Sequence, residues 1–574
     1  MMLSLVAAFA VFLHVLGVYA HVNNLMGWES ASDKPSVKQL GNHAIDLNME
    51  SRRAGNLLVQ GSQNGFHGIE YDSSTDAHEI SSEATPPPLE IIPLIISGPS
   101  TNRVDLVFFS DGYLPQERQK FIDDALRLAV DVSKNQTFNT VQPLLNFWAA
   151  FSPSNETGIG NEGPKDLGSR VVICEKRTPF GLYRVGTELR GVYYAYPNVG
   201  RAACDSLGEQ CDYPILLGND PLYGGLGGDF TVITASILNG PLVLRHELGH
   251  SILEVGEEYD GGYAYFGSNA GHDTKDFPWK QWLSRVDQLG GPRIERSVMA
   301  MQAYPWTLLN TTTPWSVSFN SSGTYERYSV QLSLAGIPNK GDLLVTLDGV
   351  DLGWEPRTAV GMDRWFYNYF SSATLSPGIH ELKFSLLNGE NLGSAQLCST
   401  EILEYGSEDE FVTEPGFYSL YPTYSDVNET SYRPTNGDCL MRAVTTPNFC
   451  KVCLETLWLN LLRNVTFIDD INESCSQRSD SPSILVKTLR LGLLPLAHLR
   501  NSDIIPNESY TIFWKKNGKA LPQYTNKTVI EIEEDSVGEY TATVKFSTEE
   551  IRINSPRLES ELTYQVVEPC KDSR

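Results

Sequence analysis

The chain has 574 residues, of which 41% are hydrophobic and 10% aromatic, enough apolar material to fill the cores of several domains. The formal net charge of −26 at pH 7 argues against nucleic-acid binding and against docking on an anionic membrane. This composition is typical of a soluble, acidic extracellular protein, and we expect its charge to form a solvated surface rather than to serve a particular partner.

Residues 1–20 have the character of a secretory signal peptide. Residues 5–18 are apolar and Val18-Tyr19-Ala20 gives a small-residue cleavage pattern, although the basic residues usual at the start are missing. The apolar run is too short to span a membrane comfortably, and the sequence contains no other long apolar run. We therefore expect a secreted, extracellular protein without a membrane anchor.

Glycosylation sequons and cysteines agree with the secretory pathway. Nine Asn-x-Ser/Thr sites predict a glycoprotein, and in an oxidising compartment most of the nine cysteines should be paired, with one left free or intermolecular. The pair Cys450 and Cys453 has the spacing of a zinc knuckle, but the sequence has no second such pair, so we expect disulfides to nearby cysteines there. The sequons are at Asn135, Asn155, Asn310, Asn320, Asn428, Asn464, Asn472, Asn507 and Asn526, and the cysteines are Cys174, Cys204, Cys211, Cys398, Cys439, Cys450, Cys453, Cys475 and Cys570.

Residues 21–95 form an N-terminal segment with two interpretations. It is either a pro-segment that is removed or a small β unit, with one strand over residues 55–61. Residues 73–88 are rich in Ser, Thr, Glu and Pro, which is typical of a linker. Both interpretations fit the sequence.

The catalytic part is expected to begin at residue 96 with an α/β layer. A buried strand, a turn and a helix follow one another, and this succession opens such a layer. Asp111 lies in the turn, where it is better explained as a turn residue than as a site residue. The strands are predicted at residues 104–109, 146–151 and 213–217, and the helix at residues 115–132.

A glycine-rich stretch, residues 223–228, runs into the β-branched residues 231–234. Such a segment predicts an exposed edge strand that can pair with an extended peptide. A phosphate-binding loop is the alternative, but the stretch lacks the Gly-Lys-Ser/Thr ending of that motif. A peptide substrate is therefore favoured.

The chain is organised around the motif His-Glu-x-x-His, formed by His246, Glu247 and His250. Residues four apart lie on one face of a helix, so both imidazoles can reach one ion, and two neutral imidazoles suit Zn²⁺. Glu247 lies beside the first histidine, where its carboxylate can take a proton from water at the metal. The motif predicts a catalytic zinc site.

A third protein ligand must follow the motif, because catalytic zinc takes three protein ligands and a water. If the helix ran on, residue 257 would lie roughly 13 Å further along the axis at about 1.5 Å per residue, beyond the reach of a glutamate. The chain must therefore turn back, and Gly256 can take the left-handed conformation that such a turn requires. Glu257 and Glu258 then both come within reach.

Two β modules flank the remaining part of the catalytic domain. Residues 315–405 read as an inserted β-sandwich of short alternating strands, and residues 406–475 return to mixed character as the second catalytic part. Residues 476–574 resemble an immunoglobulin-like domain without its usual disulfide, with Trp514 before a turn and Tyr540 in a Gly-x-Tyr strand. Because the metal motif lies upstream, we expect peptide cleavage to survive removal of this last module.

Four stretches together resemble the secreted metallopeptidases of the immunoglobulin A peptidase family, a zincin group. The stretches are residues 102–113, 223–228, 246–259 and 433–453. The resemblance covers about residues 100–465 and is interrupted by the β insertion. It implies an α+β zincin-like catalytic domain with a twisted sheet, a metal-binding helix and a lower subdomain.

The resemblance also implies roles for single residues. His246 and His250 would bind Zn²⁺, and Glu247 would be the general base. Because the family has a Glu-Tyr pair at this point, Glu258 is preferred to Glu257 as the third ligand, and Tyr259 could donate to the oxyanion. The other carboxylate and Asp260 would accept hydrogen bonds from the histidine N–H groups.

A methionine beneath the metal is a further expectation from this group of enzymes. Met441 lies in a family-like segment and is the preferred apolar floor, whereas Met299 and Met301 match no pattern. A plain core role is open for all three side chains.

The sequence as a whole predicts a secreted zinc metalloendopeptidase that hydrolyses extracellular proteins or peptides. Its β modules would position the enzyme or contact glycans. One alternative is a catalytically inactive secreted binding protein, for glycans or cell walls, on a protease-like core; another is a metal-dependent deacylase or amidase. The intact motif disfavours the first, and the predicted edge strand disfavours the second.

Overall fold

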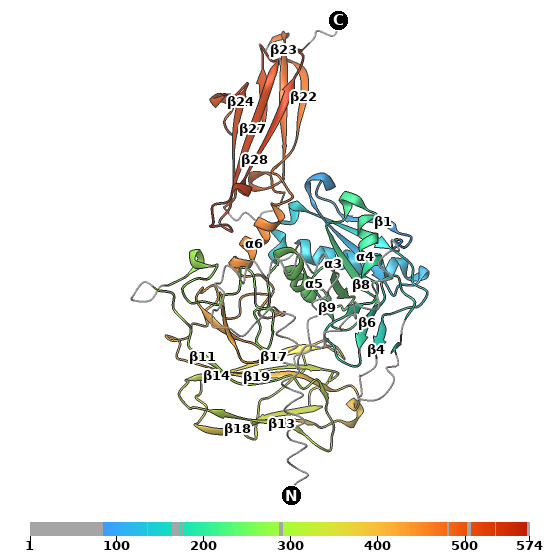
Figure 1. The fold of residues 1–574 in the computed structure, drawn as a ribbon, viewed down its shortest axis with the longest axis vertical. Coiled ribbons are helices and arrows are strands. Elements are labelled where there is room, and N and C mark those ends of the chain that lie inside the picture. The colour runs from blue at the N-terminus through green and yellow to red at the C-terminus, as the bar shows by residue number, and fades with distance from the viewer. Residues whose placement is uncertain are drawn as a thin grey trace, which may run out of the picture. The chain divides into compact units, whose positions relative to one another are not determined.

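The computed structural model describes residues 84–134, 136–162, 173–174, 176–285, 291–478, 481–501, 507–533 and 535–570. The expected signal peptide, nearly all of the N-terminal segment and the sequon at Asn135 lie outside these ranges. The described chain is a mixed α/β fold in which sheets outnumber helices (Figure 1). Within these ranges, no helix has the length and apolar character that crossing a membrane requires.

A six-stranded mixed sheet supports the metal motif. Strand β2 pairs in parallel with β3 and β8, β10 pairs in parallel with β8, and the two outer strands, β1 and β9, run antiparallel to their neighbours. The order is β1 (Glu90–Ile95), β3 (Leu145–Phe151), β2 (Val104–Asp111), β8 (Tyr213–Gly218), β10 (Thr231–Thr234) and β9 (Gly225–Leu226).

The sheet is buried on both faces, which explains the continuous apolar run in β2. Leu106 and Phe108 point into one core, and Val107 and Phe109 point into another, because successive side chains alternate across a strand. Helix α3 (Arg118–Lys134) covers the first face over β1 and β3. Its buried residues recur at helical spacing, as predicted: Phe121, Ala125, Leu128 and Val132.

A small second sheet and helix α4 (Pro197–Asp205) cover the other face. The disulfide between Cys204 and Cys211 follows this helix. The sheet has the order β5 (Ile173–Cys174), β4 (Gly160–Glu162), β6 (Leu182–Val185) and β7 (Tyr193–Tyr194).

The inserted module is a sandwich of two antiparallel sheets, visible as two layers in Figure 1. It begins at Ser297, earlier than the predicted residue 315, because β11 joins the first sheet through β19. The first sheet holds β11 (Ser297–Ala303), β19 (Gln396–Tyr405), β14 (Arg327–Ala335) and β17 (Trp365–Ser371), with β12 (Thr307–Leu308) on β19; the second holds β13 (Trp315–Ser321), β18 (Gly378–Leu386), β15 (Leu343–Leu347) and β16 (Val350–Asp351).

The chain then leaves the sandwich and returns to the part that carries the histidine motif. A hairpin of β20 (Tyr421–Tyr424) and β21 (Thr430–Arg433) leads to helix α6 (Lys451–Leu461), which is buried beside the metal helix. The buried face of α6 includes Val452, Leu457 and Trp458.

The C-terminal module also consists of two sheets. Trp514 on β24 is buried, and the hydroxyl group of the buried Tyr540 on β27 donates to Ser536 O at 3.1 Å. Cys475 and Cys570 form a disulfide. One sheet contains β22 (Ile468–Arg478), β23 (Ser481–Leu493) and β26 (Val529–Ile532); the other contains β25 (Lys519–Ala520), β24 (Ser509–Lys516), β27 (Gly538–Ser547) and β28 (Glu559–Val566).

The core of this module is continuous with the core around α6. The ring of Phe546 lies 5.4 Å from that of Trp458 on α6 and 5.1 Å from that of Phe467. At the same boundary, the buried Arg103 pairs with Asp469 at 2.7 Å. Removal of the module would expose this apolar surface. That cleavage of short peptides survives such a removal stays a prediction.

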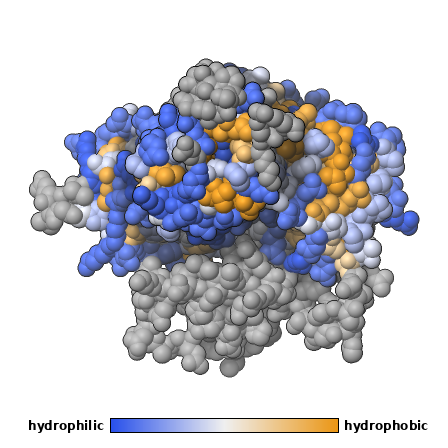
Figure 2. Space-filling model, turned by 90° about the horizontal axis from the view of Figure 1, so that it is seen from above, coloured by the Kyte–Doolittle hydropathy of each residue, from blue (hydrophilic) through white to orange (hydrophobic). Residues whose placement is uncertain are grey.

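Hydrophilic residues prevail on the face drawn in Figure 2, and hydrophobic residues gather there in separate patches. The eight sequons within the described ranges all have exposed asparagines.

We predict that Phe546→Ala lowers the free energy of unfolding by about 3–5 kcal/mol, because it leaves a cavity between the two modules. Unfolding in urea, followed by tryptophan fluorescence, should remain a single transition, shifted to lower urea concentration. Phe513→Ala is the matched control, since Phe513 on β24 is 40% exposed, and it should change stability by no more than about 0.5 kcal/mol. Separate unfolding of the C-terminal module in the wild type would contradict the shared core.

Candidate metal centre

Helix α5 (Gly240–Leu248) carries the first histidine and continues as a π-helical turn, Gly249–Leu253, that carries the second. Pro241 lies in the first turn, where a missing N–H costs nothing. Val243, Leu244, Leu248, Ile252 and Leu253 are buried in the core beneath the sheet. This apolar stripe fixes the rotation of the helix and turns the histidines away from it.

The two imidazoles meet Glu257 at their Nε2 atoms. Nε2 of His246 lies 3.2 Å from Glu257 Oε2, and Nε2 of His250 lies 3.1 Å from Glu257 Oε1. The ligand atoms of these three residues lie within 4.8 Å of one another. The structure therefore brings Glu257 to the histidine pair.

Backbone carbonyls fix the orientation of both rings. Nδ1 of His246 lies 3.1 Å from Leu440 O, and Nδ1 of His250 lies 2.8 Å from Val255 O. A carbonyl can only accept, so each Nδ1 carries the proton, which leaves the Nε2 lone pair for an ion. These carbonyls take the place that the sequence analysis gave to Asp260.

Asp260 has other partners. Its carboxylate accepts from Arg442 Nη2 at 2.6 Å and from Tyr424 N at 2.8 Å. Arg442 also donates to Glu258 O at 3.0 Å. Asp260 therefore holds the loop that follows the metal helix rather than an imidazole, and this corrects the expected role.

The chain reverses after the π-helical turn at Glu254 and not at Gly256. Glu254 adopts the left-handed conformation, with φ 57° and ψ 43°. Gly256 is needed for a different reason: a Cβ there would overlap Ala264 O and lie 2.7 Å from Phe266 N. The returning segment is held by hydrogen bonds from Gly256 N to Phe266 O and from Glu257 N to Ala264 O, both 2.8 Å.

Glu258, the residue that the family resemblance favours as third ligand, points elsewhere. Its Oε1 accepts from Asn269 Nδ2 at 3.0 Å and lies 3.7 Å from Cys453 Sγ. Glu258 belongs to a group with Cys439, Cys450 and Cys453, separate from the histidines. Neighbouring glutamates thus serve two different clusters.

The charges of the metal centre stabilise one another. Burial opposes ionisation of Glu257, but the positive charges of His250 and His246 outweigh it and lower the pKa of Glu257 to about 2. Burial likewise opposes the charged form of His250, yet the Glu257 charge and hydrogen bond raise its pKa to about 9, and the pKa of His246 is raised in the same way. The ionised Glu257 thus stabilises positive charge beside it, on the two histidines or on a cation bound between them.

Glu247 lies beside this cluster and is buried. Burial raises its pKa above the ordinary value of a glutamate, against the influence of the two histidines. Among the described residues, its Oε2 atom has no hydrogen-bond partner. A buried carboxylate with a free oxygen and a raised pKa has the properties of a general base.

The glycine-rich stretch packs directly on Glu247. A Cβ at Gly225 would overlap Val243 Cγ1 and lie 2.9 Å from Glu247 Oε1, and a Cβ at Gly227 would lie 2.7 Å from His250 Cβ. Only glycine permits this approach. The predicted exposed edge strand is found only in part. β9 is an outer strand of the sheet, but both of its residues are buried and Gly225 N donates to Arg190 O at 3.3 Å, whereas residues 231–234 form the inner strand β10.

The inserted sandwich contributes residues that the sequence gave no reason to choose. Asp363 accepts from Tyr223 N at 2.5 Å and from Asn239 Nδ2, at the start of α5, at 2.8 Å. Arg364 lies over the Tyr223 ring, with its guanidinium carbon 4.9 Å from the centroid. These contacts fix both the glycine-rich stretch and the N-terminus of the metal helix.

Tyr223 is itself a functional candidate that the sequence analysis missed. Burial raises its pKa to about 12, and among the charges that act on it are those of Glu247 and Glu257. A neutral phenol near these carboxylates can donate a hydrogen bond. Tyr259, the donor considered from the sequence, stacks on His246 with ring centroids 6.5 Å apart.

Met441 lies against the metal helix, whereas Met299 and Met301 belong to other clusters. A Cβ at Gly249 would lie 2.6 Å from Met441 Sδ, so the thioether packs on the turn between the two histidines.

Asp111 does not contact this turn: its carboxylate accepts from Phe180 N and Leu182 N at 2.8 and 2.9 Å. It lies at the end of β2 and not in the predicted turn, and these bonds give it a structural role.

Residues 92–306 match the family model described as IgA Peptidase M64, which confirms the resemblance found in the sequence motifs. No curated protein matches the sequence. Similar solved structures include a GH2 beta-galacturonidase from Eisenbergiella tayi bound to glycerol, with 9% identity, a TM-score of 0.10, and 46% of this chain and 43% of that chain covered.

Another is the exo-chitosanase of Amycolatopsis orientalis in complex with PNP-beta-D-glucosamine, with 9% identity, a TM-score of 0.11, and 44% of this chain and 25% of that chain covered. The chain thus spans less than half the length of either structure. With TM-scores this low, neither likeness bears on the fold or the function.

We predict that Gly225→Ala lowers kcat/KM for peptide hydrolysis by about 100-fold, because the added methyl group displaces Glu247 from its place beside the histidines. Gly437→Ala is the control, since a Cβ at Gly437 meets nothing within 4 Å. Both variants should keep the wild-type melting temperature within a few degrees. Unchanged kinetics in Gly225→Ala would contradict the close packing of β9 on the metal helix.

Proposed function

We propose, from the match of residues 92–306 to the IgA Peptidase M64 family model, that the chain is a secreted zinc-dependent endopeptidase. That match supports a peptidase of the metallopeptidase type. The observation that carries the proposal further is the convergence of His246, His250 and Glu257, with Glu247 next to them.

The residues present fit a zinc ion. Two imidazole nitrogens and a carboxylate are a known ligand set for catalytic zinc, which leaves a fourth position for water or substrate. The Nδ1 contacts to Leu440 O and Val255 O hold both Nε2 atoms in the orientation that ligation needs. The proposed ligands are therefore His246, His250 and Glu257, and Glu258 is not among them.

When bound, zinc would polarise a water molecule and the carbonyl group of the substrate. Glu247 would accept the proton of the attacking water and deliver it to the amine that leaves. Tyr223, kept neutral by a pKa of about 12, would donate a hydrogen bond to the oxygen on which negative charge develops. The part of β9 beyond Gly225 would align an extended peptide by backbone hydrogen bonds.

Several features support an extracellular setting for this activity. The N-terminal sequence has the pattern of a signal peptide, and the sequons of the described ranges are all exposed and therefore accessible to glycosylation. The two β modules would position the enzyme or contact glycans, and the C-terminal one would be immunoglobulin-like. An inactive binding protein would have no need of a buried base beside two histidines.

We predict that the purified protein cleaves internal bonds of a mixed peptide library and that a chelator stops the reaction. Glu247→Gln keeps the shape of the side chain but cannot act as a base, so hydrolysis should fall by about 100- to 10,000-fold. Glu254→Gln is the control because Glu254 is partly exposed and pairs with Arg463 outside the metal centre. Sequencing of the product ends would separate endopeptidase from exopeptidase action, and normal turnover by Glu247→Gln would refute the proposal.

A zinc titration distinguishes the two neighbouring glutamates. The measured quantity is the zinc concentration that restores activity after chelation. Loss of a group that only orients a ligand already weakens metal affinity by about 10–100-fold, so loss of the ligand itself in Glu257→Gln should raise this concentration by at least about 100-fold. Glu258→Gln should need a smaller increase than Glu257→Gln, because Glu258 does not contact the histidines and would act on the centre only through its neighbours. The reverse result would make Glu258 the ligand.

A further inference from the structure

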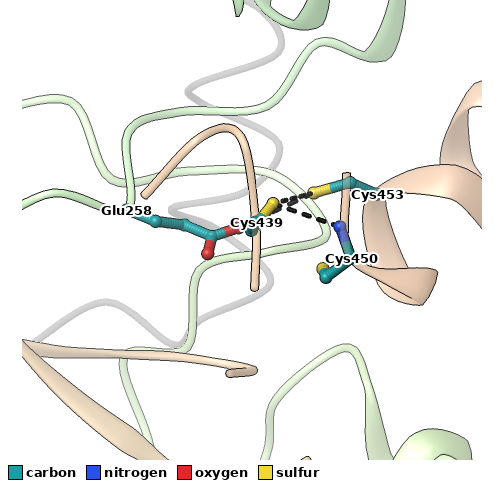
Figure 3. Close-up of side chains that lie close together, drawn as sticks. All are labelled: Glu258, Cys439, Cys450 and Cys453. Atoms are coloured by element: carbon teal, nitrogen blue, oxygen red, sulfur yellow. Dashed lines mark hydrogen bonds between the residues drawn. The ribbon is translucent and has the colours of Figure 1, made fainter. Parts of the chain in front are cut away.

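A second cluster of metal-binding side chains lies apart from the histidines. Glu258, Cys439, Cys450 and Cys453 are all buried, and their ligand atoms lie within 4.8 Å of one another (Figure 3). Glu258 has no exposed surface, and within the described part of the chain its Oε2 atom has no hydrogen-bond partner. A buried carboxylate oxygen without a partner, beside three thiols, requires an explanation.

Three segments that are distant in sequence build the cluster. Glu258 comes from the segment that returns after the metal helix, where its N–H donates to Met441 O at 3.0 Å. Cys439 lies two residues before Met441, and Cys450 and Cys453 occupy the N-cap and the first turn of α6. The arrangement supplies the further ligands that the Cys-x-x-Cys pair lacks in the sequence alone.

We propose that Glu258, Cys439, Cys450 and Cys453 bind a second, structural metal ion, most suitably Zn²⁺. The Sγ atoms of Cys439 and Cys453 are 3.7 Å apart, and Cys453 Sγ is 3.7 Å from Glu258 Oε1. In a tetrahedral site with zinc–sulfur bonds of about 2.3 Å, two sulfurs are separated by about 3.8 Å. Three thiolates and a carboxylate suit zinc better than a hard cation such as Mg²⁺.

Disulfide formation is the competing fate of these cysteines. The structure joins Cys204 to Cys211 and Cys475 to Cys570 but leaves Cys439, Cys450 and Cys453 as free thiols. A disulfide between any two of these cysteines would leave the third thiol and the Glu258 carboxylate in the core without a metal to bind them. One ion satisfies all four groups at once.

Two neighbouring features would stabilise thiolates in this cluster, where burial itself opposes their negative charge. Cys450 N donates to Cys439 Sγ at 3.4 Å, and the N-terminus of α6 places partial positive charge at Cys450 and Cys453. The buried guanidinium of Arg433 donates to Asn436 O and Pro422 O, so its charge is free to offset the negative cluster. Arg442 donates to the backbone oxygen of Glu258 itself.

The proposed ion would brace the catalytic centre without taking part in the reaction. Glu258 is the neighbour of Glu257, and Cys439 is the neighbour of Leu440, whose carbonyl orients His246. An ion that ties these segments to α6 would hold a ligand and a ligand-orienting group in place. The site does not depend on the peptidase proposal, because it shares no ligand with the histidine centre.

Zinc content per chain, measured by mass spectrometry of the metal in protein from a secretory host, tests the proposal. The wild type should hold two zinc ions, and the double variant His246→Ala/His250→Ala should hold one. Adding Cys450→Ser and Cys453→Ser to that double variant should remove the remaining ion. Cys398→Ser, which changes a free and buried cysteine outside the cluster, should keep both ions. Zinc that is lost entirely with the histidines would overturn the second site, whereas one ion that survives there upholds it even if the peptidase proposal fails.

Two further measurements use the wild-type protein alone and therefore do not depend on whether the variants fold. With cobalt in place of zinc, ligation by thiolates should produce intense charge-transfer absorption in the near ultraviolet, which a histidine and carboxylate centre lacks. Alkylation after denaturation with chelator and without reductant should label Cys439, Cys450 and Cys453. A cross-linked peptide that joins two of these cysteines would overturn the proposal.

Discussion

The position of one carboxylate group, between two imidazole rings, constrains much of this structure. Glu257 reaches Nε2 of both His246 and His250 only because the chain reverses after the metal helix. Such a group of buried charges is costly unless each member has a partner, and here each histidine is held on its other side by a backbone carbonyl. The left-handed Glu254 and the bonds of Gly256 and Glu257 to the segment that follows serve this one arrangement.

Parts of the chain that lie far from the motif in sequence complete the arrangement. The inserted sandwich provides Asp363, which binds both the glycine-rich stretch and the start of α5. The returning part provides Leu440, Met441 and helix α6, and the core of the C-terminal module continues from α6. The β modules are therefore part of the support of the centre and not only appendages to it.

The central part of the site can be predicted from the sequence. The spacing of His246, Glu247 and His250 depends only on the geometry of a helix, and the strands at β2, β3 and β8 follow from continuous apolar runs. The choice between Glu257 and Glu258 could not be predicted, because successive side chains of an extended segment point to opposite sides and the sequence does not reveal which side faces the helix. The same holds for the turn: Gly256 is the residue best suited to a left-handed conformation, yet Glu254 adopts it and Gly256 accommodates a backbone contact. The grouping of Glu258 with Cys439 depends on tertiary contacts between distant segments, which no local pattern records.

The central claim is that a metal ion is bound by His246, His250 and Glu257. Anomalous diffraction from a crystal of the zinc-loaded protein, recorded on both sides of the zinc absorption edge, tests it most directly. We predict a peak about 2.0–2.2 Å from the two Nε2 atoms and from a carboxylate oxygen of Glu257. A zinc-loaded crystal without a peak between the histidines, or with Glu258 in place of Glu257 at the ion, would contradict the account.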